Sequence, residues 1–171
     1  MKKQLTIGIF VFLIISNIVF IIATTFYKTK IDNQVFKVYS FDGENNDMRI
    51  TNGIIIISPN KQTVSGGEIL YTGSKNENIK SYSEIIYFKN RENTENIVLH
   101  NSVSFQNENK GIVFPDEFLL NKNVGGVSSE KLFSEDNLNI IKDNLYFSLD
   151  YSKVNGETGN FTIKLNINEI K

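Results

Sequence analysis

The chain has 171 residues, with 18 basic side chains, 19 acidic side chains, one histidine and no cysteine. The lack of cysteine excludes disulfides, thiol nucleophiles and cysteine-ligated metals, and one histidine excludes a metal site built from several histidines of one chain. Residues 31–171 hold all 19 acidic and 14 of the basic side chains, and their net charge of −5 argues against nucleic acid and against an anionic lipid or polymer as the main partner.

The first element in chain order is an uncharged run of 23 residues from Leu5 to Tyr27, with two lysines close to each end. At about 1.5 Å per helical residue it reaches roughly 34 Å, enough to cross the core of a bilayer. The aromatic pair Phe26-Tyr27 before Lys28 suits the membrane–water interface. We therefore predict an N-terminal membrane anchor in residues 1–30, with a single transmembrane helix at about 5–27, and a separate domain in residues 31–171.

A cleaved signal peptide is the alternative interpretation of this run. Signal peptides have an apolar core of about 7–15 residues and a small-residue cleavage site. This run is longer, and its last small residues, Ala23, Thr24 and Thr25, precede bulky aromatic side chains. We expect the segment to stay uncleaved. Because the short end is slightly more positive, we place the N-terminus inside and the C-terminal domain outside, as a single-pass protein of the cell membrane.

The clearest pattern in residues 31–171 is a β-hairpin near the C-terminus. Apolar and polar side chains alternate over residues 145–151 and again over residues 161–167. Between the two runs, Asn155-Gly156 and Gly159 are residues that favour a turn with positive φ. The pattern predicts an antiparallel hairpin with one buried face that includes Phe147 and Ile163.

Upstream of the hairpin, five stretches are rich in β-branched and aromatic residues: 35–41, 49–57, 67–73, 79–88 and 97–105. The second ends in four consecutive isoleucines before Ser58-Pro59-Asn60, which suggests a strand covered on both faces. Short spacing and frequent turn signals favour an all-β fold.

One segment departs from the strand pattern. Ser134 precedes two acidic residues and the apolar Leu138 and Ile141, which indicates a capped short helix leading into the strand at Leu145. A helical corner followed by a closing hairpin resembles the end of an immunoglobulin-like fold. We therefore predict an immunoglobulin-like antiparallel β-sandwich. In composition and anchoring, the chain also resembles the small anchored ectodomains of low-GC Gram-positive bacteria.

Residues suited to catalysis are few. His100 alternates with apolar neighbours, so we expect it on a strand surface, with no acidic partner or nucleophile identifiable. Ser128 and Lys131 match the S-x-x-K spacing of penicillin-recognising serine enzymes. That chemistry needs further motifs and a larger α/β scaffold, so we interpret the match as chance.

Acidic residues gather at Asp42, Glu44 and Asp47, whose oxygens could hold calcium. The spacing fits no EF-hand loop, and a solvated turn is the simpler interpretation. Asp116 and Glu117 follow a proline and also suit a turn. No glycine-rich phosphate loop links a strand to a helix. We predict no cofactor, no metal and no catalytic residue.

The aromatic residues suggest a binding surface more strongly than the polar candidates do: Tyr82, Tyr87, Phe88, Phe114 and Phe118 lie on neighbouring predicted elements. In a sandwich, alternate members face outward, and exposed tyrosines can stack on sugars or contact a protein. We expect the phenylalanines in the core and propose Tyr82 and Tyr87 as partner-binding residues.

Two classes of function remain open. The first is a non-enzymatic, membrane-tethered module that binds a protein or a cell-envelope component, besides the bilayer that holds its helix. The second is an envelope hydrolase that uses carboxylates alone, which requires two carboxylates facing each other in a cleft. A minor pilin-like subunit also begins with an apolar helix, but no long amphipathic helix follows Tyr27. We favour the first class.

Overall fold

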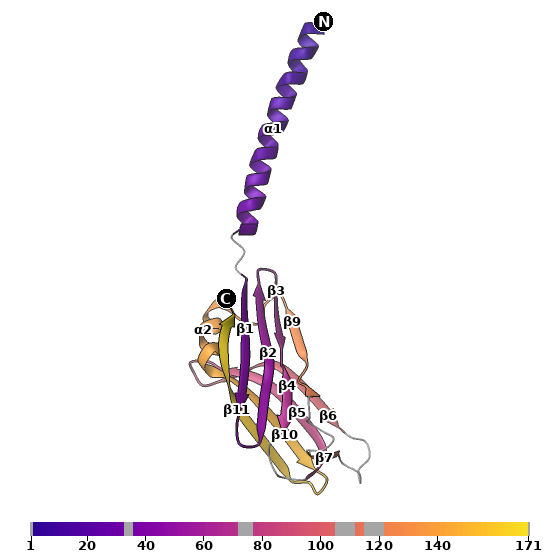
Figure 1. Ribbon diagram of the computed structural model, residues 1–171, viewed down its shortest axis with the longest axis vertical. Coiled ribbons are helices and arrows are strands. Elements are labelled where there is room, and N and C mark those ends of the chain that lie inside the picture. The colour runs from indigo at the N-terminus through magenta and orange to yellow at the C-terminus, as the bar shows by residue number, and fades with distance from the viewer. Residues whose placement is uncertain (1, 33–35, 72–76, 105–111, 115–121, 171) are drawn as a thin grey trace. The chain divides into compact units, whose positions relative to one another are not determined.

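The structure, a computed structural model, describes residues 2–32, 36–71, 77–104, 112–114 and 122–170 (Figure 1). The chain divides into two compact units, Met1–Val35 and Phe36–Lys171. The first contains α1 (Lys2–Asp32). The elements of the second are β1 (Lys37–Glu44), β2 (Met48–Ser58), β3 (Lys61–Ser65), β4 (Glu68–Tyr71), β5 (Glu77–Lys89), β6 (Glu95–Ser104), β7 (Ile112–Phe114), β8 (Lys122–Asn123), β9 (Gly126–Ser129), α2 (Glu135–Asn144), β10 (Leu145–Lys153) and β11 (Thr158–Ile170).

The helix α1 is long and apolar enough, over its 23-residue stretch Ile7–Thr29, to cross a membrane. Several of its hydroxyl groups donate hydrogen bonds within the helix: Thr24 Oγ1 donates to the Phe20 carbonyl at 2.7 Å, and Thr25 Oγ1 donates to the Ile21 carbonyl at 2.8 Å. Such bonds lower the cost of a hydroxyl in an apolar surrounding. The expected apolar helix is thus confirmed, and it begins and ends a few residues beyond the predicted run.

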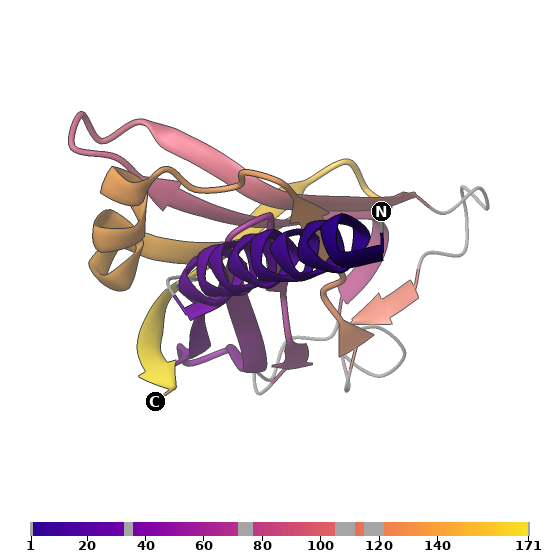
Figure 2. The ribbon, with the colours of Figure 1, turned by 90° about the horizontal axis from the view of Figure 1, so that it is seen from above.

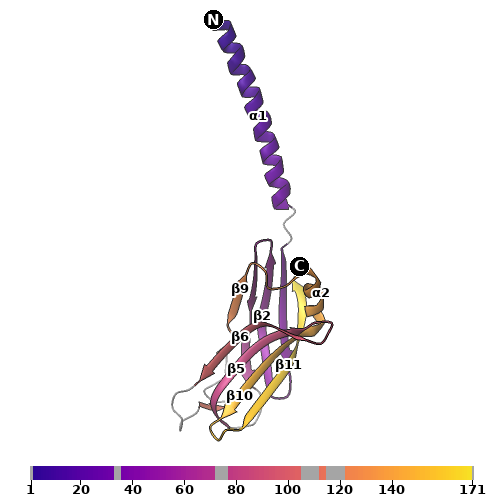
Figure 3. The same ribbon diagram turned by 180° about the vertical axis from the view of Figure 1, so that it is seen from behind.

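The second unit is a single antiparallel sheet that curls into a nearly closed, barrel-like form. Its main strand order is β6-β5-β10-β11-β1-β2-β3-β9. In Figure 1 β1, β2 and β3 lie in front, and Figure 3 shows β6, β5 and β10 on the opposite side. At the two ends of the order, β6 and β9 approach each other without a paired register among the described residues.

The long strand β11 explains why the fold is not clearly the predicted immunoglobulin-like sandwich. Its first part pairs with β10, from Thr158 opposite Ser152 to Leu165 opposite Leu145. Its last part pairs with β1, from Asn166 opposite Asp42 to Ile170 opposite Val38. Because one strand belongs to both halves, the sheet turns a corner without separating into two layers. The all-β class is confirmed, and the architecture is barrel-like.

The predicted C-terminal hairpin forms as the alternation indicates. Phe147 pairs with Ile163, and both side chains are buried on the inner face. The turn uses Gly156 at φ +88°, a conformation that glycine adopts at little cost, and the Gly156 amide donates to the Lys153 carbonyl at 3.0 Å.

The four isoleucines of β2 were expected to be covered on both sides, and this prediction is wrong. Ile55 and Ile57 point inward and are buried, whereas Ile54 on the outer face is 38% exposed. Only one face of β2 is therefore packed in the core.

The predicted short helix is α2, with Ser134 as its N-cap accepting from the Asn137 amide. It packs beside β5 and β11 and appears as the orange coil in Figure 2. The segment before it is held by the buried Gln62, whose Oε1 accepts from the Leu132 and Phe133 amides, each at 2.6 Å. This side chain satisfies backbone groups that have no strand to pair with.

Candidate functional site

The outer face of β6, β5, β10 and β11 carries a regular grid of polar side chains, here named the polar face. The registers place residues of the four strands side by side in rows, given below in the order β6, β5, β10, β11. The aspartate row is Ser102, Ser83, Asp150 and Asn160, and the serine row is Ser104, Ser81, Ser152 and Thr158. The histidine row is His100, Ile85, Ser148 and Thr162, and the aromatic row is Ile97, Tyr87, Tyr146 and Lys164. Successive rows are two residues apart, about 6.7 Å, except on β6, where a register shift places Ile97 three residues from His100; neighbouring strands are about 4.8 Å apart.

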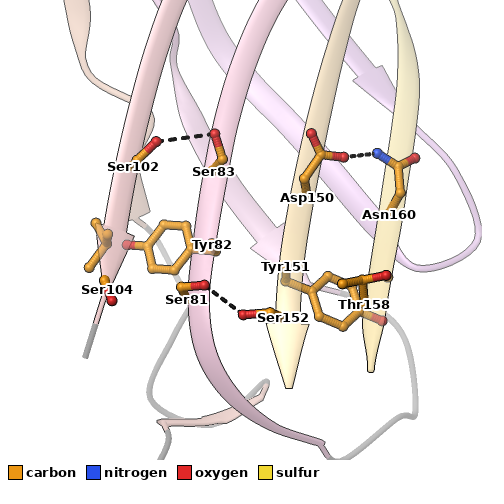
Figure 4. A pocket seen from close by; sticks show the side chains of 12 residues that line it. Ser81, Tyr82, Ser83, Ser102, Ser104, Asp150, Tyr151, Ser152, Thr158 and Asn160 are labelled. Carbon is orange, nitrogen blue, oxygen red and sulfur yellow. Dashed lines mark hydrogen bonds between the residues drawn. The ribbon is translucent and has the colours of Figure 1, made fainter. Parts of the chain in front are cut away.

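Hydrogen bonds connect these side chains across the strands (Figure 4). Ser83 and Ser102 lie 3.2 Å apart, and Ser81 and Ser152 lie 2.6 Å apart, between their hydroxyl oxygens. On the neighbouring strands the Asn160 amide donates to Asp150 Oδ1. These four serine hydroxyls are therefore held in position by a neighbour rather than rotating freely.

A second set of bonds fixes Asn160 and Asp150. Thr162 Oγ1 donates to Asn160 Oδ1 at 2.8 Å, and Asn160 Nδ2 also donates to Ser148 Oγ at 2.8 Å. Ser148 Oγ in turn donates to Asp150 Oδ1 at 3.3 Å. The other carboxylate oxygen, Asp150 Oδ2, has no hydrogen-bond partner within the described part of the chain and is available as an acceptor.

The aspartate and serine rows line an open depression with a volume of about 760 Å³. Tyr82, Val103 and Tyr151, which lie between the two rows along their strands, also border it, although Tyr82 and Tyr151 are buried. The Tyr151 ring lies over Gly159, where a Cβ would collide with it, and stacks on Phe161 at 5.5 Å between ring centroids. A glycine at this position therefore lets an aromatic ring fill the space beneath the rows.

The lining of the depression carries little charge. Among its described lining residues Asp150 is the only charged side chain. The remaining groups are mostly neutral hydroxyls, two of which, on Ser104 and Thr158, have no hydrogen-bond partner among the described residues and are exposed. A depression of this kind offers many donors and acceptors and little charge.

His100 is exposed on this face, as the alternation predicted. Its Nε2 lies 2.7 Å from Ser83 Oγ and 3.0 Å from Ser102 Oγ, hydroxyl contacts that the sequence did not reveal. Within the described chain no carboxylate hydrogen-bonds to the imidazole, and Asp150 pairs with Ser83 from the opposite side. The arrangement thus lacks the acid that orients the histidine of a serine triad.

Tyr82 and Tyr87 do not form the exposed pair expected from the sequence. Tyr82 points inward and is 3% exposed, and Tyr87 is 6% exposed although it lies in the aromatic row. Tyr87 stacks on Tyr146 with centroids 5.5 Å apart. Burial, followed by the nearby Glu95, Tyr146 and Asp150, raises the pKa of the Tyr87 hydroxyl. Tyr146, which the sequence analysis passed over, is the more accessible of the two stacked rings.

A buried carboxyl group lies on the inner side of the same strands. Glu84 is 0% exposed, and its Oε2 accepts from Asn101 Nδ2 at 3.2 Å. Its Oε1 has no hydrogen-bond partner among the described residues. Burial raises the pKa of Glu84 to about 7, and the Asn101 hydrogen bond lowers it only in part. Glu84 is not among the residues that line the depression.

The remaining candidates do not assemble into a site. Ser128 lies in β9 with its hydroxyl 2.9 Å from that of Thr63, and Lys131 follows in irregular chain, so the S-x-x-K pair is not on a helix. Phe88 is buried, as expected for a core phenylalanine. Phe118, Asp116 and Glu117 lie outside the described residues, and of Phe114 only the backbone is described.

Of the acidic residues at 42–47, Asp42 and Glu44 lie at the end of β1, where they line a small hollow with Arg49, and Asp47 lies in the turn before β2. Asn45 Oδ1 accepts from the amides of Asp47 and Met48, and Glu44 is paired with Arg49 at 2.8 Å. Across the described residues no group of three or more histidine and acidic side chains could hold a metal ion.

Comparison with known proteins adds no family to this description. No protein-family model, no curated protein and no solved structure matches the chain.

Proposed function

We propose that the protein is a membrane-anchored, extracytoplasmic binding module that recognises a protein or a component of the cell envelope through its polar face, without catalysis. The observation that carries this proposal is the grid of rigidly held hydroxyl and amide groups around an open depression. Pre-oriented polar groups on strands reduce the entropy lost when a ligand binds.

The apolar helix supports the anchoring part of the proposal. Its stretch Ile7–Thr29 has the length of a bilayer crossing. A module held at the membrane surface meets the inner layers of an envelope at high effective concentration, so a weak binding site is sufficient.

The alternative of a carboxylate hydrolase receives less support. Such an enzyme needs two carboxylates that flank one substrate bond. The described lining of the depression contains Asp150 alone, and Glu84 lies on the other face of the sheet.

Anchoring is tested on the full chain in membranes. We expect the protein to stay in the membrane fraction after an alkaline carbonate wash, with an intact N-terminus by sequencing, and its C-terminal unit to be digested by protease added from outside. A mature chain that begins near residues 25–31 would show that the segment is a cleaved signal peptide.

Binding is tested by crosslinking in membranes followed by pull-down of the full chain. We expect captured envelope material to be reduced in Asp150→Ala and retained in Asp42→Ala, an exposed aspartate on the outer face of β1. Equal capture by both variants and the parent protein would remove the polar face from the proposal.

A further inference from the structure

We propose that the polar face binds a neutral glycan strand, with Asp150 accepting hydrogen bonds from the hydroxyls of one sugar and Tyr146 contacting a second sugar nearer the aromatic row. This inference rests on the proposed binding function and names the class of its ligand. Four features of the face lead to it.

The first feature is charge. The described residues around the depression include one carboxylate and no basic side chain, and residues 31–171 have a net charge of −5. A phosphate-rich or carboxylate-rich polymer would find no cation to pair with inside the depression, since the lysines nearest to the polar face, Lys89 and Lys164, lie at the aromatic row. A neutral, polar ligand needs no cation to pair with and is not repelled by the negative charge.

The second feature is hydrogen-bonding capacity. Asp150 Oδ2 can accept two hydrogen bonds, while Oδ1 is held by Asn160 and Ser148. Neighbouring hydroxyls on one sugar ring present two donors at the spacing that a carboxylate accepts. A bond from a neutral donor to a carboxylate is stronger than one between neutral groups, so Asp150 is the expected anchor.

The third feature is the supply of accessible hydroxyl groups around Asp150. Ser104 and Thr158 stand exposed at the two ends of the serine row, and Ser102 is exposed in the row above. Each can donate one hydrogen bond and accept others. Sugars carry hydroxyl groups of the same dual character around the whole ring, so a glycan satisfies these groups together.

The fourth feature is the stacked pair Tyr87–Tyr146. Tyr146 lies on the same strand and the same face as Asp150, four residues away, a distance of about 13 Å along a strand. Its ring is held by Tyr87 on one side, and Lys89 Nζ lies 5.4 Å from its centroid. Because Tyr87 and Lys89 lie against the ring, the accessible part of Tyr146 at that distance can contact a second sugar further along a glycan strand.

These features favour a glycan over a protein partner. Protein interfaces have an apolar or aromatic centre and a polar rim. Here the polar rows form the centre, and the exposed Ile97 and the half-buried Tyr146 lie at one end.

The test measures co-sedimentation of the full chain, in detergent micelles, with insoluble chitin and cellulose, which are neutral glycans. We expect retention to stay the same between about 50 and about 500 mM salt, a range over which interactions between exposed charges become strongly screened. The soluble tetramer of N-acetylglucosamine should compete with retention on chitin, and the soluble tetramer of glucose with retention on cellulose. Asp150→Ala should weaken retention roughly tenfold or more, and Tyr146→Ala should weaken it by a smaller factor.

Asp42→Ala is the matched control, because it removes a carboxylate that is also exposed but lies on β1, outside the polar face, and it should leave retention unchanged. Asp150→Asn covers the case in which Asp150→Ala does not fold, since it keeps an acceptor for Asn160 and removes only the charge; it too should weaken retention.

Three outcomes would overturn the glycan assignment: no retention of the parent protein on either glycan, equal retention of the Asp150 variants and the parent, or retention abolished by salt. If the parent binds no glycan while crosslinking captures an envelope protein through Asp150, the glycan assignment fails and the broader binding proposal stands. If neither glycan nor any envelope material is captured, both fail.

Discussion

The two faces of β5 and β10 follow the same alternation of side chains but differ in how their polar groups are exposed and hydrogen-bonded. On the outer face, Ser83 and Asp150 are partly or fully exposed and belong to a connected set of hydrogen bonds. On the inner face, Glu84 stands opposite Leu149, with one of its oxygens unpartnered among the described residues. A polar group that water can reach costs little, whereas one in the core costs free energy unless it is fully paired. The outer face is thus suited to binding, and the inner face determines stability.

The largest effect is expected on the inner face, at Phe147. Its side chain is 0% exposed and is packed among other buried side chains of the core. Replacing it with alanine removes apolar contacts and leaves a cavity, so Phe147→Ala should lower the free energy of unfolding by about 3–5 kcal/mol. Urea unfolding followed by circular dichroism measures this loss.

The control for that experiment lies on the same strand but faces out. Asp150→Ala should cost less than about 1 kcal/mol of stability, because its hydrogen bonds are exposed to water. Equal losses in the two variants would contradict the assignment of inner and outer faces.

The next effect concerns Glu84 and is a dependence on pH. Its pKa is raised from 4.5 to about 7 in the folded protein, so the folded state binds the proton more tightly than the unfolded state does. Below pH 4.5 the carboxyl is neutral in both states, and Glu84 does not lower the free energy of unfolding. As the pH rises from 4.5 towards 7, the unfolded state loses this proton first, and the free energy of unfolding falls. The size of the shift corresponds to about 3 kcal/mol.

Glu84→Gln isolates the effect of Glu84 ionisation on stability, because the glutamine amide has nearly the same shape as the carboxyl group and does not ionise. The free energy of unfolding of the variant minus that of the parent protein should increase by about 3 kcal/mol as the pH rises from 4.5 to about 8. Urea unfolding of both proteins at each pH measures this difference. A constant difference across this range would mean that folding does not raise the pKa of Glu84.

Much of this contrast between faces follows from local sequence, and some of it does not. Alternation alone placed Phe147 and Ile163 inward and His100 outward, because strand periodicity depends only on neighbouring residues. The same rule applied from Tyr82 through Ile86 places Glu84 inward, although its charge gives no sign of the burial that the structure shows.

The polar face itself could not be predicted, because it depends on pairing between distant strands. Ser83 lies beside Asp150 only because β5 pairs with β10 across 67 residues of chain. No local pattern fixes which strands pair or in which register. The barrel-like closure has the same origin, since it depends on how β11 divides its pairing between β10 and β1.

The smallest effect is expected at Ser83, at the centre of the polar face. Its hydroxyl contacts His100 and Ser102, and those two side chains also contact each other at 3.0 Å. After Ser83→Ala the histidine keeps one partner and water reaches the other groups, so the free energy of unfolding should change by less than about 0.5 kcal/mol. The proposed glycan retention should fall measurably in the same variant, because the aspartate row loses one of its hydroxyls. A loss of stability above about 2 kcal/mol would instead indicate that Ser83 is a structural residue, and would make the outer face resemble the inner one. Urea unfolding and co-sedimentation of one purified preparation therefore decide whether the two faces have the separate roles assigned to them.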